Sequence, residues 1–149
     1  MAFVHGKSSV FKLDNASGSL TDISAFVNNV DFPETADVAE TSVLGASNKT
    51  YIVGLKDATI SLGGLFDATV DAILGAVVGQ TATLSYEYSP EGTGSGKVKY
   101  TGEAILTNYA LSSPVGDVPL TLVTIKNAPP PTVELAELSL AVPCTPVAV

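Results

Sequence analysis

The sequence predicts a mainly β domain, a β-sandwich or barrel, with one flanking helix, a long loop between two strands and extended termini. Three observations carry this prediction. Several segments alternate apolar and polar residues with a period of two. A single segment has apolar residues at helical spacing. The chain has 149 residues, of which 46% are hydrophobic and only 15% charged, which favours one folded domain with a real core over disorder.

Strands are expected over residues 8–13, 56–66, 81–88, 97–106 and 115–126. In the middle three segments apolar residues alternate with polar ones, which is typical of antiparallel strands with one buried and one solvated face. The last segment is apolar on both sides and is expected to lie between two covered surfaces. The residues expected on the buried faces of the middle segments are Ala58, Ile60, Leu62, Phe66, Ala82, Leu84, Tyr86, Tyr88, Val98, Tyr100, Ala104 and Leu106.

One helix is expected over about residues 67–78. Its apolar residues stand at positions 70, 73, 74 and 77, which places them on one face of a helix. Asp67 is a favourable N-cap residue, because its carboxylate can accept a hydrogen bond from the first helical turn. Gly79 supplies the left-handed conformation with which helices commonly end.

The segment Glu34–Tyr51 shows little periodicity and is therefore predicted to be a long loop. Connections of more than about 12–15 residues are usually functional or disordered. The compact pattern ends at residues 127–131, which read NAPPP. We therefore divide the chain into a β domain over residues 1–126 and a proline-rich apolar arm over 127–149. Exposed apolar segments of this kind mark surfaces that bind partners.

The residues argue against an enzyme. The single histidine, His5, and the single cysteine, Cys144, stand near opposite ends of the chain, whereas a nucleophile and its base must be held at hydrogen-bond distance. No cluster of His, Cys, Asp or Glu has the spacing of metal ligands. The glycine-rich segment 92–98 lacks the first glycine, the hydroxyl residue and the following helix of a phosphate-binding loop. We expect no catalytic residue, no cofactor and no metal.

The charge pattern restricts the partners. The net charge is −8 and all seven basic residues are lysines, so the arginine forks of a sequence-reading nucleic-acid binder are absent. No stretch of about 18 apolar residues predicts a membrane span. The opening residues lack the apolar region of a secretory signal, and a lone cysteine is typical of a reducing cytoplasm.

Four segments carry a resemblance to a known family. They are residues 58–67 (ATISLGGLFD), 84–92 (LSYEYSPEG), 96–109 (GKVKYTGEAILTNY) and 112–118 (SSPVGDV). In this order, with a helix after the first segment, they resemble the major tail tube proteins of long-tailed, siphovirus-like bacteriophages. The resemblance covers residues 3–126, and it is carried by the succession of elements rather than by one short motif.

The resemblance implies a β-sandwich or barrel flanked by a helix, whose copies form hexameric rings that stack into a tube for DNA ejection. It implies a structural protein of the virion tail, assembled in the cytoplasm of the host bacterium. The implied partners are other copies of the chain, a tape measure protein, tail terminator or tail tip proteins, and the passing genomic DNA, which is bound without sequence specificity.

Two sets of candidate residues follow. Polar strand faces can line a water-filled lumen, which we expect to be net negative so that DNA phosphates are repelled. The lumen candidates are Asp57, Thr59, Ser61, Thr83, Ser85, Glu87, Thr101 and Glu103. The long loop and both termini are the natural contacts between rings, and the candidates there are Phe3, Val4, Thr41, Ser42, Val43, Leu44, Asn48, Leu138 and Leu140.

Two other functions compete with a tube protein. The first is a small β-sandwich module that decorates a capsid or binds a cell surface, and the second, weaker one is a cytoplasmic hydrolase. Self-assembly of the purified chain distinguishes a tube protein from a decoration module, because a decoration module stays monomeric or trimeric until it meets its target. A hydrolase needs a pocket of polar groups, and a single histidine argues against one.

Overall fold

The computed structural model describes residues 5–127 and 132–135 of the chain. Within them, nine strands, one α-helix and a short 3-10 helix follow one another along the sequence. In chain order they are η1 (Gly6–Ser8), β1 (Val10–Asp14), β2 (Leu20–Asp22), β3 (Val27–Asp31), β4 (Glu34–Glu40), β5 (Tyr51–Leu65), α1 (Ala68–Val77), β6 (Leu84–Ser89), β7 (Val98–Ser112), β8 (Leu120–Asn127) and β9 (Thr132–Leu135).

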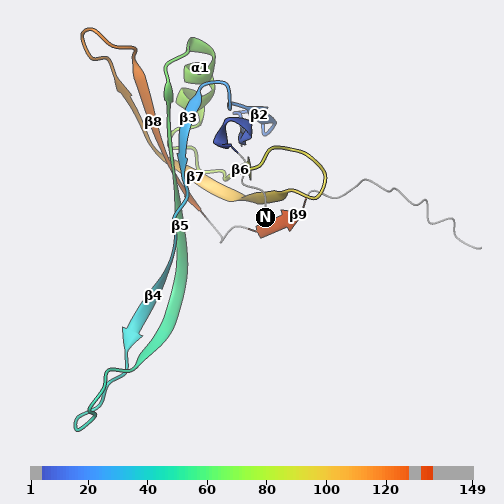
Figure 1. The fold of residues 1–149 in the computed structure, drawn as a ribbon. Coiled ribbons are helices and arrows are strands. Elements are labelled where there is room, and N and C mark those ends of the chain that lie inside the picture. Colours follow the sequence, from blue (N-terminus) through green and yellow to red (C-terminus); the bar gives the residue numbers. More distant parts are fainter. Residues whose placement is uncertain (1–4, 128–131, 136–149) are drawn as a thin grey trace, which may run out of the picture.

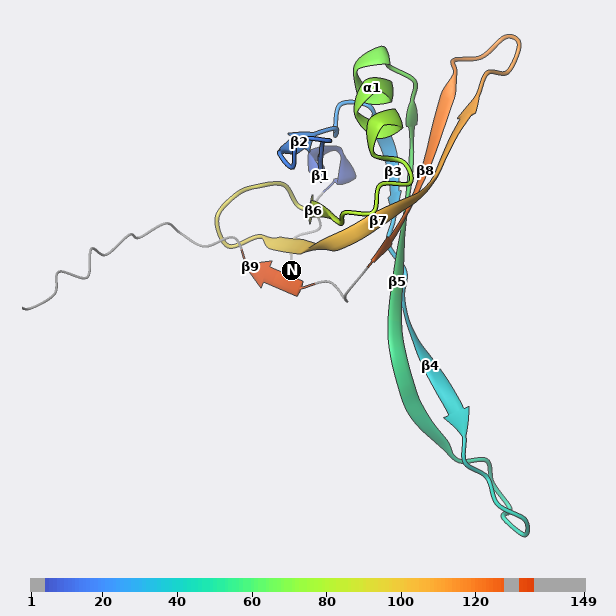
Figure 2. The ribbon, with the colours of Figure 1, turned by 180° about the vertical axis from the view of Figure 1, so that it is seen from behind.

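The strands form one antiparallel sheet in the order β2-β1-β6-β7-β8-β5-β3, with β4 added to β5 and β9 added to β7. The two long strands, β5 and β7, hold the sheet together (Figures 1 and 2). One half of β7 pairs with β6 and β9, and the other half pairs with β8. The expected mainly β fold with one helix is confirmed, and residues 132–135 of the expected arm lie in the sheet as β9.

The core lies on one face of the sheet, under α1. Ile60, Ile125 and Leu106 stand in register on β5, β8 and β7, and each is at most 1% exposed. The predicted alternation is confirmed over residues 58–64 of β5, where every second residue is buried. In β6 Leu84 and Tyr86 are buried as predicted, whereas Tyr88 is half-buried. The buried cluster comprises Phe11, Leu13, Ile23, Ile60, Leu62, Val70, Leu74, Val77, Leu84, Tyr86, Ala104, Leu106, Val123 and Ile125.

Helix α1 begins and ends as predicted. The Asp67 carboxylate accepts a hydrogen bond of 2.8 Å from the Thr69 N–H, and Gly79 has a φ of +73°. Val70, Leu74 and Val77 are buried against the sheet. The hydroxyl of Tyr109 on β7 donates a hydrogen bond of 2.5 Å to the Asp71 carboxylate, so that a polar contact joins helix and sheet beside the apolar one.

This contact predicts a loss of stability at high pH. Burial, together with the neighbouring Asp71 carboxylate, raises the pKa of Tyr109 from 10.0 to about 12. Because the folded chain holds this proton more tightly than the unfolded chain, the contribution is complete below pH 10 and is lost as the pH rises towards 12. We expect Tyr109→Phe to remove that part of the decline, measured as the difference between the two chains in urea unfolding from pH 9 to 11.

The segment Glu34–Tyr51 is not a long loop, which corrects the sequence prediction. Residues 34–40 form β4, which pairs with β5 from Glu34↔Ala58 to Glu40↔Tyr51. A hairpin tip over residues 41–50 connects the two strands. All seven residues of β4 are exposed. Because neither face of this strand is buried, nothing imposes the period of two by which a strand is recognised.

The expected strand over residues 115–126 also differs. It begins at Leu120, and only one of its faces is covered by other described residues. Val123 and Ile125 are buried, whereas Leu120 and Leu122 on the other face are 43% and 49% exposed. Phe66 and Ala82, which the alternation placed on buried faces, are exposed because they lie just outside β5 and β6, where the chain leaves the sheet.

The contact between β3 and β5 requires glycine at position 64. A Cβ atom there would lie 2.3 Å from the Phe26 carbonyl oxygen, which accepts a hydrogen bond from the Leu65 N–H. We expect Gly64→Ala to lower the free energy of unfolding by about 1–3 kcal/mol, as overpacking does. Gly63→Ala is the matched control, because its Cβ meets nothing closer than 3.5 Å. Equal melting temperatures for the two variants would contradict this explanation.

Candidate assembly surfaces

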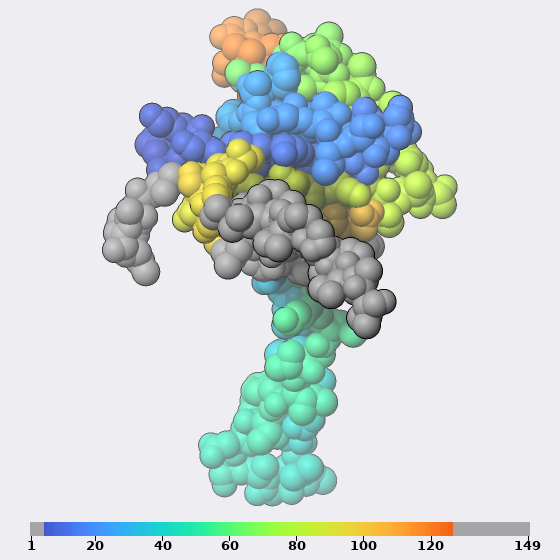
Figure 3. Space-filling model, turned by 90° about the vertical axis from the view of Figure 1, so that its right-hand side faces the viewer, coloured from blue at the N-terminus to red at the C-terminus, as the bar shows by residue number. Residues whose placement is uncertain are grey.

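A two-stranded ribbon stands out from the body of the molecule. From here on, the arm means this ribbon and not the proline-rich segment 127–149. It consists of β4, residues 51–58 of β5 and the tip between them (Figure 3). Among the described residues, this part of β5 pairs only with β4. The large apolar side chains of the arm are between 54% and 105% exposed, and they are Val38, Val43, Leu44, Tyr51, Ile52, Val53 and Leu55. An isolated two-stranded ribbon is only marginally stable in water, and these side chains give the arm an exposed apolar surface.

The tip of the arm carries five of the residues predicted to join rings. Thr41, Ser42, Val43, Leu44 and Asn48 are all exposed. Hydrogen bonds hold the base of the tip closed, since the Thr41 N–H donates to the Thr50 carbonyl at 2.8 Å and the Thr50 N–H donates to the Ser42 hydroxyl at 3.1 Å. The other predicted contacts lie outside the described residues, and they are Phe3, Val4, Leu138 and Leu140.

Seven of the eight lumen candidates share the face of the sheet opposite the core, which we call the outer face. Register places Glu87 opposite Thr101 and Ser85 opposite Glu103, while the strand alternation of β5 gives its three candidates the same orientation. The eighth, Thr83, lies just before β6 rather than in a strand, which corrects its predicted position. The seven are Asp57, Thr59, Ser61, Ser85, Glu87, Thr101 and Glu103.

The carboxylates of this set are matched by lysines on the same face. Glu87 forms ion pairs with Lys12 at 2.9 Å and with Lys99 at 3.7 Å. Lys126 lies 2.9 Å from the Asp57 carboxylate, and its hydrogen bond lowers the pKa of Asp57 below the usual range. Two of the three acids, Glu87 and Asp57, therefore pair with three lysines, while the third, Glu103, accepts a hydrogen bond from Ser85. Any negative excess on this face must come from other residues, such as Asp31, which stands opposite Ser61.

Because Glu87 is ion-paired with two lysines, reversal of its charge should lower the stability of the fold. We expect Glu87→Lys to destabilise the chain by about 1–2 kcal/mol, because it removes charge-assisted hydrogen bonding and brings three lysines together. Glu103→Lys is the matched control, since the Glu103 carboxylate accepts a hydrogen bond of 2.6 Å from Ser85 and forms no ion pair within residues 5–127 and 132–135. Urea unfolding of both variants measures the difference, and a Glu103 variant as unstable as the Glu87 variant would contradict it.

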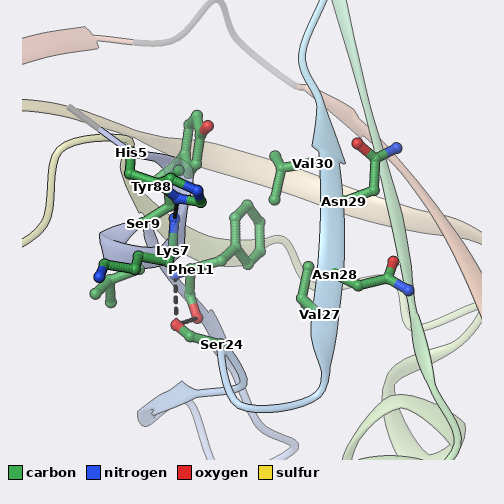
Figure 4. Close-up of a pocket in the computed structure, with 12 residues that line it drawn as sticks. His5, Lys7, Ser9, Phe11, Ser24, Val27, Asn28, Asn29, Val30 and Tyr88 are labelled. Atoms are coloured by element: carbon green, nitrogen blue, oxygen red, sulfur yellow. Dashed lines mark hydrogen bonds between the residues drawn. The ribbon is translucent and has the colours of Figure 1, made fainter. Parts of the chain in front are cut away.

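A groove that the sequence analysis missed lies between the N-terminal segment and β3 (Figure 4). It has a volume of about 550 Å³. Phe11, Val27, Val30 and Tyr88 supply its apolar lining, and burial raises the pKa of the Tyr88 hydroxyl. The short alternation of the first strand was a sequence signal for one wall of the groove. The opposite wall, residues 27–31 (VNNVD), has no regular period and so could not be predicted as a strand.

Residues 5–127 and 132–135 contain no group of three or more His, Cys, Asp or Glu side chains that could hold a metal ion. In the same residues no helix is long and apolar enough to cross a membrane.

Solved structures with the same fold come from tails and related tubes. A chain in the tail of an empty gene transfer agent particle, refined with C6 symmetry, superposes with a TM-score of 0.70 at 18% identity, covering 87% of this chain and 98% of that one. The SPP1 tail tube gives 0.71 at 10% identity, with coverage of 92% and 82%. No protein-family model matches the chain, and no curated protein is significantly similar to it in sequence.

The likeness extends to a contractile machine. A chain of the sheath–tube complex of an extracellular contractile injection system superposes with a TM-score of 0.62 at 14% identity, with coverage of 89% of this chain and 91% of that one. The chain therefore has the fold of tail tube proteins, as the sequence resemblance implied. This fold is not specific to siphovirus-like phages, because the contractile system shares it.

Proposed function

We propose that this chain is a structural protein that forms the tube of a phage-type tail. Copies assemble side by side into rings, and the rings stack. The observation that carries the proposal is the arm, whose exposed apolar side chains and unpaired strand edges call for a second copy of the chain. The fold supports it, since the similar structures include a tail tube and a sheath–tube complex.

Six copies make each ring in this proposal. The C6 symmetry of the similar gene transfer agent tail supports that number. The arm and the loop between β7 and β8 point away from the body at opposite ends (Figure 1). These two projecting elements suit head-to-tail stacking, in which one end of a copy contacts the other end of the next copy. Such a contact between two different surfaces can repeat without limit along a tube.

The tube serves as the conduit for DNA, and the outer face lines its lumen. The pairing of Lys12, Lys99 and Lys126 with carboxylates supports this role. Free lysines would bind phosphates with release of counterions and hold the duplex, whereas paired lysines leave a polar surface along which DNA can slide. The chain has no enzymatic part in this process. Its partners are a tape measure protein and the tail terminator or tail tip proteins, and it acts in the virion tail after assembly in the host cytoplasm.

Electron microscopy of the purified full chain tests the proposal. We expect negative-stain images to show tubes with sixfold end views, and a reconstruction to show the outer face towards a lumen wide enough for a double helix. A chain that stays monomeric or trimeric at high concentration, with or without preformed tail tips as initiators, would overturn the proposal in favour of a decoration module. Tubes with the outer face turned away from the lumen would overturn the assignment of the conduit.

A further inference from the structure

The arm joins the body at a point where the sheet narrows. In the body β5 lies between β8 and β3, and these two pairings end at Thr59 and Ser61. Phe32 and Pro33 stand between β3 and β4, and proline has no N–H group to donate. The Thr59 N–H donates to the Pro33 carbonyl oxygen at 3.4 Å, which is long for a hydrogen bond of a ladder. Backbone pairing is therefore weak at this joint.

The side chain of Phe32 fastens the joint on the core face of the sheet. Its ring meets three tyrosine rings edge to face, and the centroid distances are 6.3 Å to Tyr86, 6.4 Å to Tyr88 and 5.6 Å to Tyr100. Tyr88 and Tyr100 stand in register on β6 and β7, and their rings are stacked. Edge-to-face contacts add to the gain from burial of the rings. Phe32 therefore packs against several rings at once, which fixes its position.

These ring contacts join two parts of the sheet that are distant in strand order. Three strands, β7, β8 and β5, stand between β6 and β3, so backbone pairing connects Tyr86 and Tyr88 to the arm only indirectly. Figure 2 shows that the half of β7 beside β9 runs across the direction of β5. A contact between these two parts therefore restrains the angle at which the arm leaves the body.

A second fastening lies on the outer face. The Lys126 ammonium group on β8 forms an ion pair of 2.9 Å with Asp57, which belongs to the arm. The two side chains are 56% and 47% exposed, and an exposed ion pair adds little because water and salt screen it. Phe32 is half-buried and packs against the buried core cluster. Phe32 is therefore the stronger of the two fastenings.

We propose that Phe32 sets the direction of the arm in the free chain, before any second copy binds. Phe32 is a positioning residue in this role, because it acts through the arm, whose exposed apolar side chains make the contact. A preset direction lowers the entropy lost on association, since fewer orientations of the arm are given up when two copies join. The inference deepens the proposed function and rests on it, because the arm is the element to which self-assembly is assigned.

Distances between spin labels test the inference in the full chain, diluted until size-exclusion chromatography shows single copies. In a Cys144→Ala background, one pair of labels on Ile52→Cys in the arm and Leu20→Cys on β2 reports the distance between arm and body. A second pair on Leu20→Cys and Leu122→Cys lies within the body, and all three native side chains are exposed. We expect Phe32→Ala to at least double the width of the first distance distribution and to leave the second unchanged.

The matched control is Leu74→Ala, which also removes an apolar side chain from the core. Leu74 lies on α1, at the end of the body away from the arm (Figure 1), so neither distribution should broaden. Asp57→Asn removes the exposed ion pair and should broaden the first distribution less than Phe32→Ala does. In the unlabelled chain, Phe32→Ala should raise the concentration needed for tubes at least fivefold.

Three results would overturn the inference: an unchanged first distribution in Phe32→Ala, equal broadening of both distributions, or equal broadening by Leu74→Ala. If Phe32→Ala does not fold, Phe32→Leu takes its place, because it keeps an apolar side chain and loses only the edge-to-face contacts. We expect an intermediate width from it, and an unchanged width also overturns the inference. The labels report on single copies, so this test needs no tubes, whereas absence of tubes from the unsubstituted chain contradicts the proposed function instead.

Discussion

Deletion of Thr41–Asn48 is expected to yield a folded chain that forms no tubes. The deletion joins Glu40 to Lys49, and because Glu40 pairs with Tyr51, the connection becomes a two-residue hairpin loop. Lys49→Asn and Thr50→Gly in the same variant supply the turn that such a loop favours. The deleted residues are exposed and contribute nothing to the core. Circular dichroism and melting should match those of the full chain, while electron microscopy should show particles no larger than single rings.

A substitution of equal length separates lost contacts from altered length. Val43→Ser with Leu44→Ser keeps the tip and removes side chains that are 73% and 105% exposed. We expect it to raise the concentration needed for tubes at least tenfold. Leu20→Ser on β2 serves as a comparison, because this side chain is 47% exposed and lies neither in the arm nor in the loop between β7 and β8. Normal tubes from the eight-residue deletion would show that the tip does not join rings.

Leu106→Ala should cause a large loss of stability. The Leu106 side chain is 1% exposed and stands in register with Ile125, so its removal leaves a cavity in the centre of the core. Large-to-small substitutions of this kind cost about 2–5 kcal/mol. Ile105→Ala is the control, because the neighbouring side chain points to the outer face and is 37% exposed. Urea unfolding measures both, and similar losses would contradict the assignment of the two faces.

The sequence predicted the elements that bury one face. Ile60 and Leu62 on β5, and Leu84 and Tyr86 on β6, alternate with polar residues because the sheet separates core from solvent there. The helix was predicted for the same reason, since three of its apolar residues contact the sheet and its ends carry local capping signals.

The sequence did not predict the elements that have an exposed apolar face or none buried, nor those that depend on contacts between distant segments. β4 has no buried face, so its seven residues show no period and were interpreted as loop. Leu120 and Leu122 are apolar without being covered in the chain, which made β8 look buried on both sides. The groove depends on a bulge next to Val27 and on the packing of β3 beside β1, and neither leaves a pattern in one short segment.

The uninterrupted course of β5 from the arm into the core determines how the molecule carries mechanical load. Tension applied at the tip passes along the strand into residues 59–65, which pair with β8 over seven successive positions. The hydrogen bonds of an antiparallel ladder run perpendicular to the strands, so this pull loads them in shear, and they must break together rather than peel one after another. A pull on the tip is therefore resisted by the seven residue pairs between β5 and β8 acting together, before it can unravel the rest of the fold.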